Sequence, residues 1–194
     1  MTYQELLANI RDLGFSDDTE MLEFGELVNN SINRSISEIN VEFAHIKKKY
    51  EFELDDNDTG FVYITMPSID GQYLSLVDHP ITYEVNGTGV YTNFSNYYIE
   101  MDDTIVINAD RNKGKFRIFY NAAHQTYTGE SMNSTPLPLP LKAHHLVPLL
   151  ASYYIWLEDE PVKAAQYYNL YEQKKAAYQA DAERPRMRVL EGGI

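Results

Sequence analysis

One short segment has residue types and spacing that suggest metal binding. Asp55, Asn57 and Thr59 precede Gly60 in the arrangement that opens a calcium-binding loop. Six residues after the glycine, where such a loop needs a bidentate glutamate, the chain has Met66. Because this ligand is missing, we expect the segment to form an ordinary turn between two strands.

Histidines provide the other candidate chemistry. His144 and His145 are adjacent, and on a helix their rings would point about 100° apart, so they cannot chelate one metal ion together. Asp78 and His79 resemble half of a hydrolytic triad, but no activated serine lies nearby. The chain contains no glycine-rich phosphate loop, nucleophile elbow or zinc-binding helix motif. We therefore expect no enzyme activity, no catalytic residue, no metal and no cofactor. A hydrolase built around Asp78 and His79 remains a third-ranked alternative.

Composition limits the range of partners. The chain has 194 residues, of which 44% are hydrophobic, which is enough for one domain or a domain with an insertion. Its formal net charge is −13, which argues against wrapping nucleic acid but suits a wall that DNA must pass without sticking. The chain has no cysteine, no visible signal peptide and no apolar run long enough to span a bilayer. We therefore expect no membrane partner. Sixteen tyrosines suit strands and protein interfaces.

Two helices are predicted at the N-terminus. The first covers Tyr3 to Leu13 and stops at Gly14. The second is predicted as one continuous helix from Asp17 to Lys47, about 45 Å long. Its apolar residues recur every three or four positions: Met21, Phe24, Val28, Ile32, Ile36, Ile39, Phe43 and Ile46. Three lysines, Lys47 to Lys49, would complement the dipole at its C-terminal end.

A second pair of helices is predicted near the C-terminus. Leu137 to Pro140 should be extended, since each proline restricts the residue before it. An apolar helix follows, with Asp159 as N-cap and Pro161 in the first turn of a tyrosine-rich helix that runs to Asp181. The pair forms a predicted αα-hairpin. One face of its first helix needs a partner: Leu146, Leu149, Leu150, Tyr153, Trp156 and Leu157.

Between the helices the hydrophobic period changes to two, which is typical of strands. Asn86-Gly87 predicts a type I′ hairpin turn between the strand Ile81–Val85 and the residues around Val90 and Tyr91. The other predicted strands are Tyr50–Leu54, Phe61–Thr65, Tyr73–Val77, Tyr97–Ile99, Thr104–Ile107 and Lys115–Tyr120. About seven short strands imply a small sandwich or barrel.

These elements predict an α+β fold. Two N-terminal helices and the C-terminal αα-hairpin form a helical bundle of residues 1–48 and 136–182. An antiparallel β-sandwich or barrel, residues 49–128, is inserted into it, and residues 129–135 form a linker. Residues 183–194 combine three arginines with apolar side chains, and we interpret them as an arm that orders on a neighbour or as a solvated tail.

This layout resembles the head-to-tail adaptor, or connector, proteins of tailed double-stranded DNA phages, including the tail tubular protein A type. The likeness lies in the helix around Asn29–Ile36 that leads into Tyr50–Leu54, and in the β insertion. It lies also in Leu137–Pro140 leading to Leu149–Leu157, followed by Ala164–Tyr171. It covers nearly the whole chain. The β insertion is larger than in the smallest members, so its role transfers least.

The resemblance implies a virion protein of the neck or tail, assembled in the host cytoplasm. Identical subunits would form a ring, dodecameric by the resemblance, beneath the portal protein and above a downstream tail or neck protein. DNA would pass during ejection without sequence-specific binding. The helices would pack laterally and on the portal, and the C-terminal arm would reach along it. We expect portal or ring contacts at Tyr153, Trp156, Tyr168, Tyr171, Arg184, Arg186, Met187, Arg188, Leu190 and Ile194.

The alternative function is a binding module whose β domain recognises a host glycan or protein. Surface tyrosines such as Tyr97 and Tyr98 would then carry saturable binding by the monomer.

Overall fold

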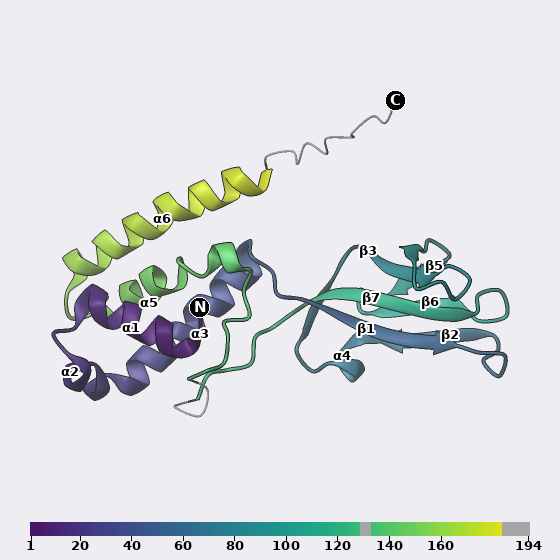
Figure 1. The fold of residues 1–194 in the computed structure, drawn as a ribbon, viewed down its shortest axis with the longest axis horizontal. Coiled ribbons are helices and arrows are strands. Elements are labelled where there is room, and N and C mark those ends of the chain that lie inside the picture. The colour runs from purple at the N-terminus through teal and green to yellow at the C-terminus, as the bar shows by residue number, and fades with distance from the viewer. Residues whose placement is uncertain (129–132, 184–194) are drawn as a thin grey trace. The chain divides into compact units, whose positions relative to one another are not determined.

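The structure is a computed structural model that describes residues 1–128 and 133–183. It is a mixed α+β fold that divides into two compact units. The helical unit contains Met1–Ala44 and the described residues from Thr126 onward, and the β unit contains His45–Gln125. Figure 1 shows helices in the first and strands in the second. Among the described helices, none is both long enough and apolar enough to cross a bilayer.

The first helix, α1, covers Tyr3–Gly14, which confirms the predicted helix. Thr2 and Glu5 form a capping box, in which the threonine side chain accepts from the Glu5 N–H and the Glu5 carboxylate accepts from the Thr2 N–H. Tyr3, Leu6 and Ile10 are its buried residues.

The predicted single helix from Asp17 to Lys47 is wrong, because the chain forms two helices. They are α2 (Asp18–Glu23) and α3 (Gly25–Glu42), separated at Phe24, whose φ of −96° and ψ of 12° leave the helical region. The ring of Phe24 lies 5.7 Å from the Phe15 ring and 6.1 Å from the Trp156 ring, so tertiary packing accounts for the break.

Within α3 the predicted apolar stripe is buried: Val28, Ile32, Ile36 and Ile39. The helix ends at Glu42, because Phe43 leaves helical geometry with φ −158° and packs its ring against Tyr178 at 5.3 Å. Lys47, Lys48 and Lys49 therefore do not complement a helix end, and they belong to the first strand.

The predicted C-terminal hairpin is formed by α5 (Val147–Trp156) and α6 (Pro161–Glu183). Glu160 and not Asp159 occupies the cap position, since Glu160 O accepts from the Ala164 N–H. Pro161 is the first helical residue, as predicted. Burial on α5 extends beyond the one predicted face: α5 contacts α1, α3 and α6, and eight of its ten residues are buried, whereas Tyr153 and Tyr154 are half-buried.

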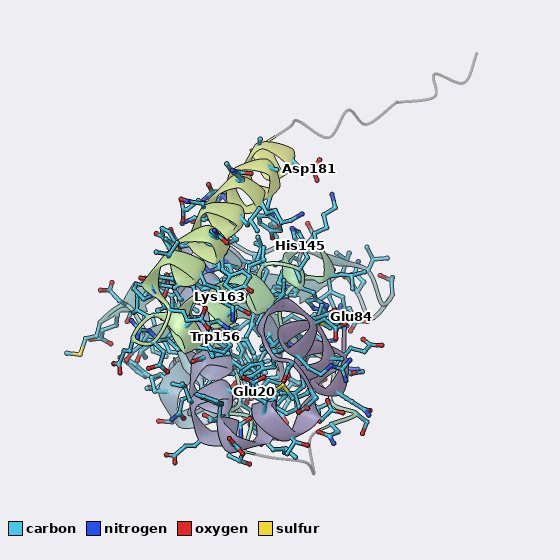
Figure 2. The ribbon with its side chains drawn as sticks, turned by 90° about the vertical axis from the view of Figure 1, so that its left-hand side faces the viewer. Glu20, Glu84, His145, Trp156, Lys163 and Asp181 are labelled. Atoms are coloured by element: carbon cyan, nitrogen blue, oxygen red, sulfur yellow. The ribbon has the colours of Figure 1, made fainter. Side chains whose placement is uncertain are left out.

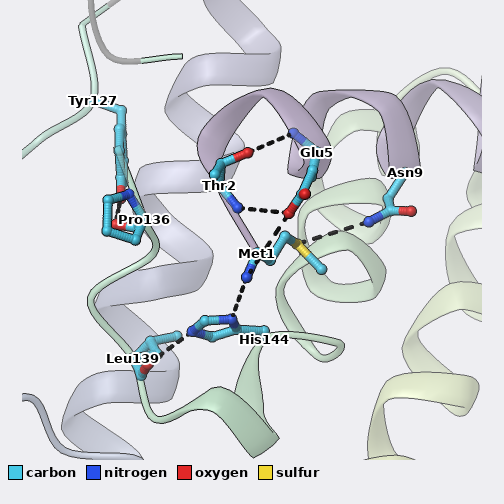
Figure 3. A network of polar contacts seen from close by, with 8 residues as sticks. All are labelled: Met1, Thr2, Glu5, Asn9, Tyr127, Pro136, Leu139 and His144. Atoms are coloured by element: carbon cyan, nitrogen blue, oxygen red, sulfur yellow. Dashed lines mark hydrogen bonds and ion pairs between the residues drawn. The ribbon is translucent and has the colours of Figure 1, made fainter. Parts of the chain in front are cut away.

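The segment before α5 runs beside the start of α1. A β-bridge joins Thr2 to Pro136, and the Leu137 N–H donates to the Met1 carbonyl at 3.0 Å. A 3₁₀ turn, η2 (Leu141–Ala143), follows. Figure 3 shows the polar contacts of this junction, in which His144 Nε2 lies 2.8 Å from the Leu139 carbonyl oxygen. These contacts fix where α5 begins.

The β unit contains two antiparallel sheets with strand orders β1-β7-β3-β4 and β2-β6-β5. Its strands are β1 (Lys47–Leu54), β2 (Phe61–Thr65), β3 (Tyr73–Glu84), β4 (Tyr91–Asn93), β5 (Tyr97–Glu100), β6 (Thr104–Asn108) and β7 (Gly114–Ala122). The predicted strands Tyr73–Val77 and Ile81–Val85 are one strand, β3, whose pairing with β7 shifts register between Leu76 and Ile81. A short helix, α4 (Met66–Ile69), was not predicted.

Both sheets contribute to one hydrophobic core, and they do not close into a barrel. Ile64, Ile105 and Ile107 enter the core from the three-stranded sheet, and Phe116 and Ile118 enter from β7. Alternation along each strand therefore gives each sheet a second, outward face.

The turn at Asn86-Gly87 joins β3 to β4 as predicted. Both residues have positive φ, 50° and 67°, which a type I′ turn requires. The loop extends beyond these two residues, since the Val85 N–H donates to the Val90 carbonyl and Glu84 pairs with Tyr91.

Candidate interaction surface

A cluster of tyrosines lies where α5 and α6 meet, and we call it the tyrosine cluster: Tyr153, Tyr154, Tyr168 and Tyr171. The ring of Tyr153 lies 4.9 Å from the rings of both Tyr154 and Tyr168, and Tyr168 lies 6.0 Å from Tyr171. Tyr168 is exposed, Tyr153 is half-buried and Tyr171 is buried. The cluster therefore presents part of its aromatic area to solvent.

Charged side chains of α3 hold Tyr154 in place. The Arg34 guanidinium lies 3.9 Å from the centre of the Tyr154 ring, a cation–π contact. The Tyr154 hydroxyl donates to the Glu38 carboxylate. Burial, and then this bond and the charge of Glu38, raise the pKa of Tyr154 to about 12. Tyr154 is therefore neutral at physiological pH and acts as a donor.

An ion pair joins α6 to the end of α3. Lys175 Nζ donates to the Glu42 carboxylate. Burial lowers the pKa of Lys175, but the hydrogen bond and charge of Glu42 outweigh it, so the pKa is raised. Burial also raises the pKa of Tyr171, and the nearby charges of Glu42 and Glu38 add to this effect. The surface between α3 and α6 is thus organised by paired charges around neutral tyrosines.

A groove of about 260 Å³ borders the tyrosine cluster between α3 and the α5–α6 turn. Leu27 and Leu157 are exposed at its wall, and Arg34, Glu158 and Asp159 supply charge. Apolar groups ringed by charged ones are typical of the centre and rim of a protein interface.

The structure places the predicted contact residues in three groups. Tyr153 and Tyr168 reach the surface, whereas Tyr171 and Trp156 lie in the interior. The other six lie outside the described residues: Arg184, Arg186, Met187, Arg188, Leu190 and Ile194.

Trp156 packs within the subunit. Its ring lies 5.1 Å from Phe15, and Lys163 Nζ lies 3.4 Å from its centre (Figure 2). The same Lys163 Nζ donates to the Gly14 carbonyl at 3.0 Å. A Cβ at Gly14 would lie only 2.5 Å from the indole nitrogen, so this close approach needs glycine. Trp156 therefore joins α1 to the helical hairpin.

Sequence reasoning missed Leu27, Arg34, Glu38 and Tyr154 as surface-forming residues. One signal was present: Arg34 and Glu38 are four residues apart, so they share a face of α3. That face lies away from the apolar stripe of α3, and hydrophobic periodicity does not predict which side chains contact a polar face.

The candidate catalytic groups are not assembled. Asp78 and His79 are exposed at the register shift of β3, and no described hydrogen bond joins either one to a serine. Within residues 1–128 and 133–183, no group of three His, Asp or Glu side chains is placed to hold a metal ion.

The calcium-like segment forms a turn. The Asn57 N–H donates to Asp55 Oδ1 at 2.7 Å, and Lys113 Nζ donates to the carbonyls of Asp55 and Asp58. The Asn57 N–H lowers the pKa of Asp55. The Lys113 ammonium group therefore occupies two carbonyl oxygens of this turn that could otherwise face a cation.

Comparison with known proteins identifies one family. The family described as SU10 adaptor protein matches residues 1–190, which includes both the helical unit and the β unit. A comparison with curated proteins finds no match.

Proposed function

Because the chain belongs to the SU10 adaptor protein family, a family of phage head-tail adaptors, we propose that it forms a ring beneath the portal. The ring joins the capsid to the tail or neck and lets DNA pass during ejection. The family match carries this proposal, since it spans both structural units and not one shared module. As a member of this family the protein is a virion component that interacts with portal and tail proteins. Assembly takes place in the host cytoplasm.

The helical unit supplies the rigid part of the ring. α5 lies between α1, α3 and α6, so the four helices act together as a bundle. A helix whose residues are mostly buried cannot turn to meet a new partner without exposing apolar side chains. The bundle therefore presents fixed outer surfaces, which suits a ring of identical copies.

We propose that Tyr153 and Tyr168, with the adjoining groove, contact a neighbouring subunit or the portal. Their partial exposure supports this role, as does their place in one aromatic cluster with Tyr154, whose ring lies against Arg34. The C-terminal residues Arg184 to Ile194 form a further contact with the portal, supported by their mixture of arginine and apolar side chains. The net charge of −13 would keep the ring from binding the DNA that passes it.

The test is the mass of the purified chain with and without its portal, measured by native mass spectrometry. We expect several copies per portal complex. Tyr168→Ser and deletion of residues 183–194 should each weaken attachment, whereas Leu74→Ser, an exposed position of the β unit, should not. A wild-type chain that never binds the portal contradicts the proposal.

A second candidate function is glycan binding by the β unit, and one groove favours it. About 300 Å³ in volume, it is lined by Tyr83, Phe94, Asn96, Arg111 and Asn112, among others. Aromatic rings beside amides suit the apolar faces and hydroxyls of a sugar. Tyr97 packs against the core and Tyr98 is exposed, and neither lines this groove. Saturation-transfer NMR with host polysaccharide tests this candidate, and Asn96→Ala should reduce the signal.

A further inference from the structure

The outward side of the three-stranded sheet is aromatic. Phe61 and Tyr63 on β2 and Tyr98 on β5 are 56%, 58% and 49% exposed. The rings of Phe61 and Tyr98 lie 6.4 Å apart. Tyr63 and Tyr98 both pair with Val106 on the central strand β6, and between them Val106 is 0% exposed. We call this surface the aromatic face.

The charge around the aromatic face is negative. Strands β2, β5 and β6 contain no lysine or arginine. Glu100, at the end of β5, is exposed, and Asp102 and Asp103 follow it in the turn to β6. Large exposed aromatic side chains with a charged rim are typical of a protein interface and are costly to leave in water.

The opposite side of the β unit is a face of another kind. Along β1 and β7 the outward residues pair across the strands, as in Lys49 with Phe119 and Glu53 with Lys115. Its cations are Lys47, Lys49, Lys115 and Arg117. We call this surface the basic face.

The basic face keeps an excess of positive charge. Its carboxylate Glu51 is shared by Lys49 Nζ at 2.9 Å and Arg117 Nε at 2.7 Å. Arg117 also lies 3.4 Å from the centre of the Tyr91 ring. Across the described residues, Lys47 and Lys115 take part in no ion pair. The outward residues of β1 and β7 include two carboxylates, Glu51 and Glu53. Among the described residues, Glu53 takes part in no ion pair.

We infer that the aromatic face of one copy binds the basic face of the next copy. The two faces belong to two sheets that share one core, and each points away from that core, so the two faces of one chain cannot contact each other. Their charges are complementary, and complementary charge sets both the partner and its orientation. A contact between two different patches of identical subunits is heterologous, and it propagates from copy to copy until a ring closes. This inference rests on the proposed ring and names one of the surfaces that build it.

A charge exchange tests the pairing. Glu100→Lys removes most of the negative charge of the aromatic face, and Lys115→Glu cancels the positive excess of the basic face, so each change weakens the attraction between identical copies. Both side chains are exposed, so each variant should fold. In an equal mixture the two variants can alternate, because the positive charge introduced at position 100 then meets the negative charge introduced at position 115.

Association of the full chain is measured by sedimentation velocity over a concentration series at low salt, where surface charges are least screened. We expect the wild type to associate, each single variant to dissociate about tenfold more readily, and the mixture to recover wild-type association. The double variant Tyr63→Ser, Tyr98→Ser should also lose association. Glu23→Lys, the same change of charge on α2, is the matched control and should behave as wild type.

Three results would overturn the inference: a wild type that stays monomeric at its highest soluble concentration, single variants that associate normally, or a mixture that does not recover. Portal binding separates this from the proposed function. A Glu100→Lys chain that still binds the portal loses only the contact between copies. A wild type that associates with itself but never binds the portal contradicts the adaptor role instead.

Discussion

Replacing Gly14 by alanine should destabilise the wild-type protein and stabilise a variant that lacks the indole of Trp156. In the wild type, the new Cβ would lie 2.5 Å from the indole nitrogen and 3.0 Å from Cε2. Trp156 is 5% exposed and packed against Phe15 and Phe24, so it cannot swing away cheaply. Overpacking of this kind costs about 1–3 kcal/mol. Alanine at a helical position gains about 0.5–1 kcal/mol over glycine, which leaves a net loss of up to roughly 2.5 kcal/mol.

In a Trp156→Leu background the sign should reverse. Leucine ends before the indole atoms that the Cβ would meet, so only the helical gain of about 0.5–1 kcal/mol remains. The background substitution itself costs less than the roughly 3–5 kcal/mol of truncating a buried tryptophan to alanine. Urea unfolding followed by circular dichroism at the helical band reports mainly on the helical unit. The reasoning fails if Gly14→Ala has the same effect in both backgrounds, since the two sites would then be uncoupled.

Three further outcomes follow from the ion pairs and turns. Glu38→Gln should lower the pKa of Tyr154 from about 12, and tyrosinate absorbance measured against a Tyr154→Phe control reports that pKa. Because folding raises this pKa, the stability that Tyr154 contributes is present below about pH 10 and is lost as pH rises through 12. The hydrogen bond from the Gln72 N–H lowers the pKa of Asp70 and outweighs desolvation, which would raise it. The stability that the Asp70 carboxylate contributes is therefore present above about pH 4 and is lost as pH falls through the pKa of Asp70 in the folded protein. Asp70→Asn should therefore cost about 1.5–3 kcal/mol at neutral pH and flatten the acid limb of an unfolding series. Gly87→Ala should cost about 1–2 kcal/mol in thermal unfolding of the β unit, because its φ of 67° suits glycine; an unchanged midpoint would argue against the turn geometry.

Local signals were sufficient for some elements. The capped start of α1, the limits of β2 and the turn at Asn86-Gly87 follow from residues that are neighbours in the chain. The apolar stripe of α3 also follows from spacing alone.

The break at Phe24 could not be predicted in this way. Apolar residues continue at helical spacing across it, and no proline marks it, although Gly25, a weak helix former, follows directly. The Phe24 ring packs against Phe15 and against Trp156, and Trp156 is distant in sequence. The hydrophobic pattern of a sequence predicts which residues are buried, whereas tertiary packing determines which residues they contact.

The same limit explains why Trp156 and Tyr171 lie inside. Helical spacing on α5 and α6 identified aromatic side chains but not which of them the other helices would cover. One signal was available: residues Val147–Trp156 include no charged side chain, which indicates a helix buried over most of its surface.

The β unit begins and ends on adjacent strands. β1 pairs with β7 from Lys47 opposite Asn121 to Leu54 opposite Gly114, so the chain enters and leaves this unit at one place. An inserted module whose two ends meet can be lost, lengthened or exchanged over generations while the surrounding helices keep their connection. Such an arrangement would let members of this adaptor family vary the β unit while the helical unit stays intact.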